Sequence, residues 1–171
     1  VNSGIMNGTS ATKFSPDRAM SRAMLVTSLY RLSGSPAVSY TNSFSDVPAS
    51  AWYADGVAWA SKNGIVTGVG GGKFNPNGNV TREQIATFLF RYAEYLGYNT
   101  SKRADLSRFP DSGSVSNFAK DAMSWAVATG ILNGTTTNDI TILAPKSPAT
   151  RAQAASFLLR FGKVVLPSLP Y

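Results

Sequence analysis

Three arginines in this chain each follow directly after a hydroxyl residue, and this placement suits the binding of an anion. The pairs are Ser21-Arg22, Thr81-Arg82 and Thr150-Arg151. A hydroxyl residue before an apolar periodic run is a typical helix N-cap, so each arginine is predicted to lie in a first helical turn. Free backbone N–H groups and the positive end of the helix dipole favour anions there. A guanidinium adds a planar pair of donors that fits a carboxylate, so all six residues are candidate binding-site residues.

A simpler interpretation of the arginines stays open at this point. Asp46 and Asp111 are candidates for ion pairs with them, and such pairs would make the arginines structural. The two roles are compatible, because a paired aspartate can hold a guanidinium in place and still accept hydroxyl groups of a ligand. Both aspartates are therefore predicted site residues. If the guanidinium faces a ligand, Arg82→Ala is expected to weaken binding with little change in thermal stability.

The arginines recur because the sequence itself repeats. A proline stands six residues before each arginine, in elements that Phe14, Phe74 and Leu143 open. A Gly-Ile-x-x-Gly segment precedes each of these elements, at residues 4–8, 64–68 and 130–134. Motifs in fixed order predict tandem units that share a core, so any site is expected in several copies.

An earlier half of the unit is present only twice. A Phe-x-Asp element ends at Asp46 and at Asp111, and an aromatic pair spaced by seven residues follows each, Trp52 with Trp59 and Phe118 with Trp125. The chain is therefore predicted to start inside a repeat. Its predicted parts are a back half at 1–37, whole repeats at 38–100 and 101–163, and a tail at 164–171.

Helical periodicity places these motifs on local elements. Helices are predicted at 52–63 and 118–129, each ended by a glycine, and at the segments that start with the three arginines. Thr81 with Gln84 and Thr150 with Gln153 match the capping-box pattern. The predicted buried stripes are Leu25, Leu29 and Leu32; Ile85, Phe88, Leu89 and Tyr92; and Ala154, Phe157, Leu158 and Phe161. Trp59 and Trp125 are predicted core residues, Trp52 is a candidate for stacking against a sugar ring, and Arg31, Arg91 and Arg160 are interpreted as solvated or helix C-terminal charges.

Composition narrows the classes of function. The net charge of +7 predicts an anionic partner, but the cations are scattered, which argues against nucleic acid. The absence of Cys and His excludes disulfides, thiol or imidazole metal sites and Ser-His-Asp catalysis. Glu83 lies at a helix start, where its carboxylate stays ionised, so it does not suit general-acid catalysis. We predict no enzyme activity, no cofactor, no metal site and no membrane span.

The order Phe-x-Asp, Trp, Gly-Ile-x-x-Gly, Phe-x-Pro and Thr-Arg-x-Gln resembles the S-layer homology repeat, whose helix-starting signature is Thr-Arg-Ala-Glu. The resemblance runs up to about Gly162. It implies a mainly α fold, a pseudo-threefold bundle of tandem helix-turn-helix repeats with short extended segments in the turns. It also implies non-covalent binding of a pyruvylated secondary cell wall polymer in grooves between repeats, on the surface of a Gram-positive-type bacterium, in the wall or S-layer. The carboxylate of the pyruvate ketal would then be the group that the arginines bind.

The sequence departs from this pattern in several places. Gln84, Gln153 and Met24 replace the signature Glu, Leu143 replaces a phenylalanine and Phe118 a tryptophan. We expect the Arg82 groove to be the strongest and a groove built from the missing first half to be empty. An alternative function is that of a structural protomer, which self-associates through the truncated repeat. If the tail, with Pro167 and Pro170, covers the face that the missing half leaves open, it can do so only as an extended segment and not as a replacement helix.

Overall fold

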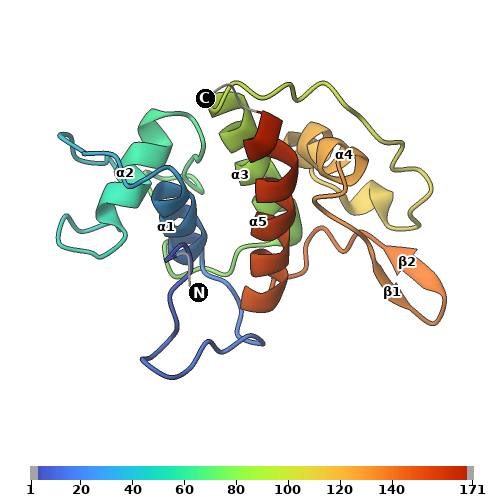
Figure 1. Cartoon of the computed structure of the whole chain (residues 1–171), viewed down its shortest axis with the longest axis horizontal. Helices are drawn as coiled ribbons and strands as arrows, with labels where there is room; N and C mark the ends of the chain where they lie inside the picture. Colours follow the sequence, from blue (N-terminus) through green and yellow to red (C-terminus); the bar gives the residue numbers. More distant parts are fainter. Residues whose placement is uncertain (1–3, 169–171) are drawn as a thin grey trace. The chain divides into compact units, whose positions relative to one another are not determined.

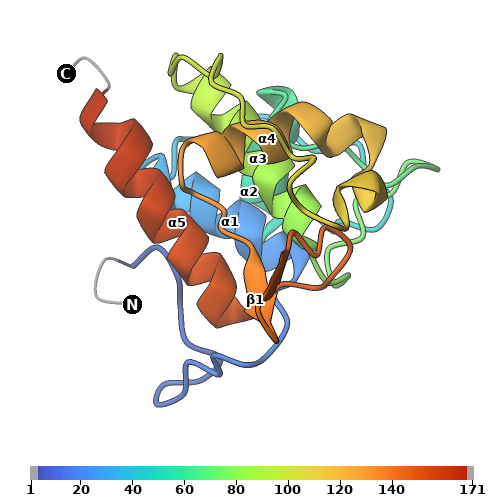
Figure 2. The same ribbon diagram turned by 90° about the vertical axis from the view of Figure 1, so that its right-hand side faces the viewer.

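The computed structural model describes residues 4–168, and these residues fold mainly as α-helices (Figures 1 and 2). The α-helices are α1 (Arg22–Leu32), α2 (Ala54–Lys62), α3 (Arg82–Tyr95), α4 (Lys120–Ala128) and α5 (Arg151–Val165). Short 3₁₀ turns lie at η1 (Ser112–Ser114), η2 (Asn117–Ala119) and η3 (Leu166–Ser168). Strands β1 (Thr135–Thr137) and β2 (Ile140–Ile142) form one antiparallel hairpin. The predicted mainly α fold class is confirmed. Across the described part of the chain, no helix is both long and apolar enough to cross a membrane.

The chain divides into two compact units that do not follow the repeats. The first unit contains Val1–Val80 with Thr150–Ala152, and the second contains Thr81–Ala149 with Gln153–Tyr171. The start of α5 therefore belongs to the first unit, and the rest of that helix belongs to the second. Each unit combines segments from different repeats, which is how arginines and loops of different repeats come to share a site.

In the first unit, α1 and α2 pack against each other closely. A Cβ added at Gly56 of α2 would lie 3.4 Å from the Cβ of Tyr30 and 3.5 Å from the Cα of Thr27, so the missing side chain permits the approach. The Tyr30 ring lies 5.7 Å from the Trp59 ring. Trp59, Leu25 and Leu29 are buried as predicted, whereas Leu32 is only half-buried.

In the second unit, aromatic pairs join the helices. The rings of Tyr92 in α3 and Phe161 in α5 stack at 5.4 Å, and Phe90 meets Trp125 of α4 edge to face at 5.5 Å. The predicted stripes of α3 and α5 are buried throughout. Trp125 is fully buried, so its predicted core position is also confirmed.

The helix boundaries follow the local signals in the sequence. The Ser21 hydroxyl accepts the N–H of Met24 at 3.2 Å, and Thr81 forms the predicted capping box with Gln84. Gly64 and Gly130 follow α2 and α4 with φ of 70° and 73°, a conformation that glycine adopts without strain.

Three local features of the structure either differ from the predictions or were not predicted. The α2 and α4 helices begin at Ala54 and Lys120, so Trp52 and Phe118 precede them in turns. The polar stretch after Gly134 is a β-hairpin, because its two turn residues adopt positive φ. As far as Ser168 the tail is helical rather than extended: α5 continues to the fully buried Val165 and a 3₁₀ turn follows. The rest of the tail lies outside the described residues.

Candidate anion-binding site

The three predicted arginines are held in the same way, each by two backbone carbonyls from a different repeat. The Nε atoms donate to the oxygens of the residues that open the x-Pro elements, and the distances are 2.8, 2.8 and 2.9 Å for Arg22, Arg82 and Arg151. The Nη2 atoms donate to carbonyls within the Gly-Ile-x-x-Gly segments. The acceptor pairs are Phe74 and Thr67 for Arg22, Leu143 and Asn133 for Arg82, and Phe14 and Asn7 for Arg151. The guanidinium groups therefore fix loops as well as carrying charge.

These guanidinium groups are buried, which changes their electrostatics. Arg22, Arg82 and Arg151 are only 4, 4 and 3% exposed. Burial lowers the pKa of each arginine from its ordinary value, because the charged form loses hydration. They remain cations at neutral pH. A buried cation attracts a nearby anion strongly, because the surroundings screen the interaction poorly.

An aromatic ring lies against each guanidinium. The central carbon of Arg22 is 4.6 Å from the centre of the Phe74 ring, and that of Arg151 is 4.7 Å from the centre of the Phe14 ring. The third repeat has Leu143 at this position, and Arg82 instead lies 5.3 Å from Phe157 of α5. Arg82 therefore has a cation–π contact although Leu143 occupies the position of the phenylalanine in the other two repeats.

Asp46 lies at the loop that Arg22 also contacts. Its two carboxylate oxygens accept the backbone N–H groups of Phe74 and Asn75, both at 2.8 Å. Asn75 has a φ of 58°, so these bonds hold a backbone conformation that costs energy in non-glycine residues. Burial alone would raise the pKa of Asp46, but the two N–H donors and the nearby Lys73 outweigh it, and the pKa is lowered.

Asp111 has the same role in the second unit. It accepts the N–H groups of Leu143 at 2.8 Å and Ala144 at 2.7 Å, and Ala144 has a φ of 49°. The charge of Asp111 also raises the pKa of Arg82 against the effect of burial, as Asp46 does for Arg22. The structure therefore brings each predicted aspartate together with one arginine, through the loop that both contact.

The third arginine lines a pocket of about 390 Å³ in the first unit. Trp52 also lines this pocket, and 62% of its surface is exposed. The apolar side chains of Met20 and Met24 also line it. The pocket thus combines a buried cation, an exposed aromatic face and an apolar lining, which is a suitable surface for an acidic sugar.

The predicted hydroxyl residues lie at the helix starts rather than in the pocket lining. Ser21 and Thr81 accept the N–H groups of the residues three positions later. Thr150 forms a backbone bridge with Ala19, which places the start of α5 beside the first repeat. These residues position the arginines that follow them.

Two cations that line the pocket were not predicted as site residues. Arg31 was interpreted as a solvated or helix-end charge; it lies in the last turn of α1, but it is half-buried and lines the pocket together with Arg18. The recurrence of Arg31, Arg91 and Arg160 nine residues after the first arginines was the available signal. Arg160 lies close enough to Arg82 to lower the pKa of that guanidinium. Arg18 has no counterpart in the other repeats, so the repeat pattern gave no reason to predict it as a site residue.

The pocket lies at the back half of the first repeat, so it is not the groove of the missing front half that was predicted to be empty. Its lining comes from residues 6–9, Arg18, Met20 and α1, with Arg151 and Trp52. These residues form the pocket within one unit of the structure. Occupancy of the three arginine sites remains a prediction.

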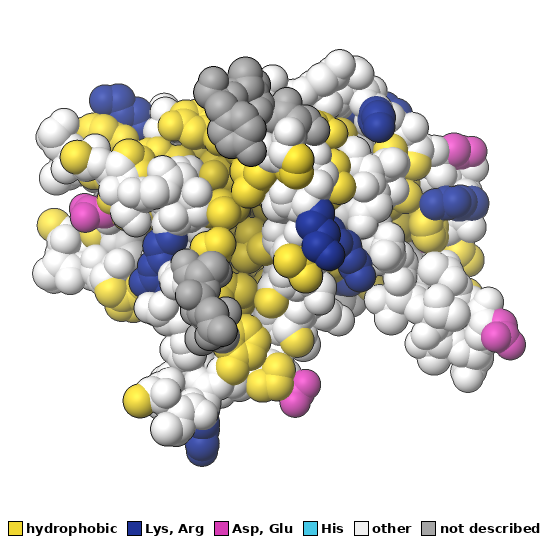
Figure 3. Space-filling model, in the orientation of Figure 1, with side chains coloured by type: hydrophobic (Ala, Val, Ile, Leu, Met, Phe, Trp, Pro, Cys, Tyr) yellow, Lys and Arg dark blue, Asp and Glu magenta, His cyan; other side chains and the backbone are white. Residues whose placement is uncertain are grey.

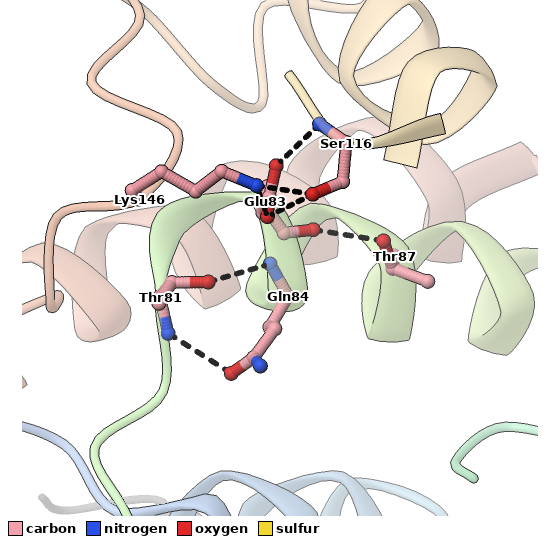
Figure 4. Close-up of polar contacts among 6 residues, drawn as sticks. All are labelled: Thr81, Glu83, Gln84, Thr87, Ser116 and Lys146. Atoms are coloured by element: carbon pink, nitrogen blue, oxygen red, sulfur yellow. Dashed lines mark hydrogen bonds and ion pairs between the residues drawn. The ribbon is translucent and has the colours of Figure 1, made fainter. Parts of the chain in front are cut away.

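A buried carboxylate fixes the first turn of α3 beside Arg82 (Figure 4). Glu83 is 3% exposed and accepts the backbone N–H and the hydroxyl of Ser116, both at 2.9 Å. The Nζ of Lys146 lies 2.7 Å from the same carboxylate. The backbone N–H of Glu83 also donates to the carbonyl of Pro145 at 3.0 Å. Glu83 therefore joins three segments of the second unit and has a structural role.

Comparisons with known proteins agree with this arrangement of motifs. The family model described as S-layer homology domain matches residues 1–23, 43–86 and 108–155. The chain is 36% identical over 155 residues to the surface-layer 125 kDa protein of Lysinibacillus sphaericus, covering 91% of this chain and 13% of that protein. It is 32% identical over 154 residues to an amylopullulanase of Thermoanaerobacterium thermosulfurigenes, covering 90% of this chain and 8% of the enzyme. An endoglucanase of Bacillus sp. (strain KSM-635) is 36% identical, with 90% and 16% covered.

A solved structure shares the fold. The undecaheme cytochrome from the S-layer of Carboxydothermus ferrireducens aligns with 90% of this chain and 18% of its own, with a TM-score of 0.51 and 18% identity. The chain spans less than a fifth of the proteins named here, so it corresponds to a module within them. Family matches in three segments and identities above 30% over nine-tenths of the chain lead to one assignment: the chain belongs to the S-layer homology domain family.

Proposed function

We propose that these residues form a non-catalytic module that attaches a larger protein to the cell wall, by non-covalent binding of pyruvylated secondary cell wall polysaccharide. The observation that carries the proposal is the threefold recurrence of a buried arginine held by two loop carbonyls. One of these arginines lines a pocket beside an exposed tryptophan. We place the module outside the cell, in the wall or S-layer.

The names of the relatives support an attachment role. A surface-layer protein, an amylopullulanase and an endoglucanase differ in what their names describe, but all contain this region as a small share of their length. A catalytic activity in the shared region would not explain all three. Attachment to a common surface would.

The chemistry of the pocket matches a pyruvate ketal. Such a ketal carries one carboxylate on a sugar ring. The Nη1 of Arg151 lies 3.4 Å from the sulfur of Met24, a weak acceptor that a carboxylate oxygen can replace as the better partner. The C–H face of the sugar would pack on Trp52. The separate small groups of Lys and Arg side chains on the face in Figure 3 fit local anion sites better than a continuous basic surface for nucleic acid.

The proposal is tested with purified wall polymer from a bacterium that pyruvylates its secondary polysaccharide. Binding of the chain to intact polymer is compared with binding to the same polymer after mild acid removal of the ketal. We expect saturable binding that falls at least tenfold after depyruvylation. Equal binding to both polymers would overturn the assignment of the pyruvate group, and absence of binding to both would overturn wall attachment.

A further inference from the structure

We propose that the second unit pairs with a second copy of this chain through its β-hairpin. The outer edges of two β2 strands would join antiparallel around a twofold axis, and Arg108 of each copy would meet Asp139 of the other. This surface is distinct from the pocket that Arg151 lines and from the truncated repeat. The inference therefore goes beyond the proposed function and does not depend on it.

The first argument is that β2 has an open backbone edge. Turn residues 138–139 both have positive φ, which is typical of a two-residue hairpin turn, so Thr137 and Ile140 beside it form a hydrogen-bonded pair. The next pair, Thr136 and Thr141, is then not hydrogen-bonded through the backbone, and its hydroxyl oxygens meet on one face at 2.7 Å. The N–H and C=O of Thr141 thus point away from β1. Within the described residues they form no hydrogen bond to another segment.

The residues of the hairpin do not protect this edge. Edge strands of monomeric proteins usually carry a lysine, a proline or a bulge that discourages pairing with another chain. The sequence of β1 is Thr-Thr-Thr and that of β2 is Ile-Thr-Ile, so both strands lack charge and proline and consist of strand-forming residues. Ile140 is 56% exposed. Antiparallel pairing around Thr141 would place Ile142 of the other copy opposite Ile140 and cover both side chains.

A cavity of about 620 Å³ gives a second strand room at this edge. Both Ile140 and Thr141 line the cavity, although successive side chains of a strand point to opposite faces. Among the described residues, none of β1 lines it. The cavity therefore extends around the outer edge of β2. The hairpin itself projects away from the helices of the second unit (Figure 1).

Comparison with the second repeat explains why this space is open. There the shorter turn at 69–73 lies against the Phe-x-Asp element, and the backbone N–H of Ser45 donates to the carbonyl of Gly72 at 3.0 Å. The equivalent residue of the third repeat is Pro110, which has no N–H to donate. The longer segment at 135–142 forms the hairpin instead, and Pro110 lines the cavity. The open edge is thus a feature of the third repeat.

Two opposite charges lie at the two ends of this edge. Asp139 is at the tip of the hairpin. Arg108 is near its base, because a Cβ added at Gly134 would lie 2.9 Å from the carbonyl oxygen of Ile142 and 3.2 Å from the ring of Phe109. The guanidinium of Arg108 lies 4.8 Å from the centre of that same ring.

This charge arrangement complements itself. Arg108 and Asp139 are both exposed and line the cavity, and no ion pair joins them to each other in the described part of the chain. Antiparallel pairing places the tip of one hairpin at the base of the other, so both charges meet an opposite charge. Parallel pairing would place Asp139 beside Asp139. The charges therefore favour a second copy in the antiparallel arrangement.

Sedimentation velocity over a range of protein concentrations tests the inference. The full chain should form a dimer as its concentration rises. Arg108→Asp and Asp139→Lys should each weaken dimerisation at least tenfold, because each leaves like charges at both contacts. An equimolar mixture of the two variants should dimerise again, since one then carries two negative and the other two positive charges there. Lys102→Asp, at an exposed cation of the same unit outside the cavity, should leave dimerisation unchanged.

A second pair of variants tests the strand edge itself. Thr141→Pro removes the outward N–H of β2, and Thr136→Pro makes the same change on the outer edge of β1, while both keep the hydrogen bonds between the strands. Only Thr141→Pro should abolish the dimer. A chain that stays monomeric at every concentration, equal effects of the two proline variants, or a mixture of charge variants that does not dimerise would each overturn the inference. Polymer binding by the monomeric variants tests wall attachment separately.

Discussion

Arg151 donates its Nε–H to the backbone carbonyl of Phe14, which lies 137 positions earlier in the chain. The same bond joins Arg22 to Phe74 and Arg82 to Leu143. The arginines of the first and second repeats thus contact the x-Pro element of the following repeat, and the arginine of the third repeat contacts that of the first. Each arginine, which the sequence suggests as a ligand-binding group, therefore also forms a tertiary contact between distant segments. Its substitution is expected to affect binding and stability together.

Arg82→Ala is predicted to destabilise the fold, in contrast to the expectation from sequence. Its guanidinium is buried and donates to the carbonyls of Leu143 and Asn133, both at 2.8 Å. Removing the donors leaves two carbonyls without these bonds and opens space under Phe157, which together cost about 2–4 kcal/mol. Urea denaturation measures the loss. Lys102→Ala, at an exposed position, is the control and should change stability by less than about 0.5 kcal/mol. Equal midpoints for the two variants would contradict the structural role of Arg82.

Glu83 and Lys146 are predicted to contribute unequally although they form one ion pair. The Glu83 side chain is 4% exposed and that of Lys146 is 56% exposed. Glu83→Ala removes the acceptor of the Ser116 N–H and hydroxyl as well as the ion pair, and should cost about 2–3 kcal/mol. Lys146→Ala loses solvent-screened contacts with Glu83 and with the Ser116 hydroxyl, and should cost less than about 1 kcal/mol. Denaturation of both variants under the same conditions measures the difference, and a larger loss from Lys146→Ala would refute it.

The carboxylate of Asp46 is predicted to make the first unit sensitive to acid. Its pKa is lowered in the folded state from the ordinary value of 3.8, so the folded state favours the ionised form. The stabilisation is complete well above pH 3.8 and is lost as the pH falls through the folded pKa. Asp46→Asn should therefore lower the stability at neutral pH. It should also flatten the decline of stability that occurs as the pH falls below the ordinary pKa of 3.8. Thermal melts from pH 7 to about pH 2 measure this slope. Asp17→Asn, at an exposed aspartate, controls for the loss of one charge, and an unchanged slope in Asp46→Asn would contradict the prediction.

The structural features that depend on local chemistry could be predicted from the sequence. Hydroxyl caps, terminating glycines and apolar stripes act within one or two helical turns, so Thr81, Gly64 and Tyr92 could be placed from spacing alone. The β-hairpin was missed even though Asn138 and Asp139, which have positive φ in the structure, are typical turn residues between strands.

Long-range partners could not be predicted in the same way. The acceptors of the arginines lie from 45 to 144 positions away, and nothing in the local sequence specifies which carbonyl a guanidinium meets. The exposure of Trp52 was likewise undecided, because two tryptophans seven residues apart on a predicted helix both suit a core. In the structure Trp52 precedes α2 and is exposed, whereas Trp59 is inside α2 and buried.

This difference between the two tryptophans gives the last prediction. Trp52→Ala removes a side chain that is 62% exposed and lines the pocket, so stability should change by less than about 1 kcal/mol while binding of wall polymer weakens at least fivefold. Trp59→Ala removes a side chain that is 3% exposed and should cost about 3–5 kcal/mol through the cavity it leaves. Denaturation and polymer binding measured on both variants separate the two roles. Full polymer binding by Trp52→Ala would exclude this ring from the site, and the pocket would then have to recognise its ligand through the arginines alone.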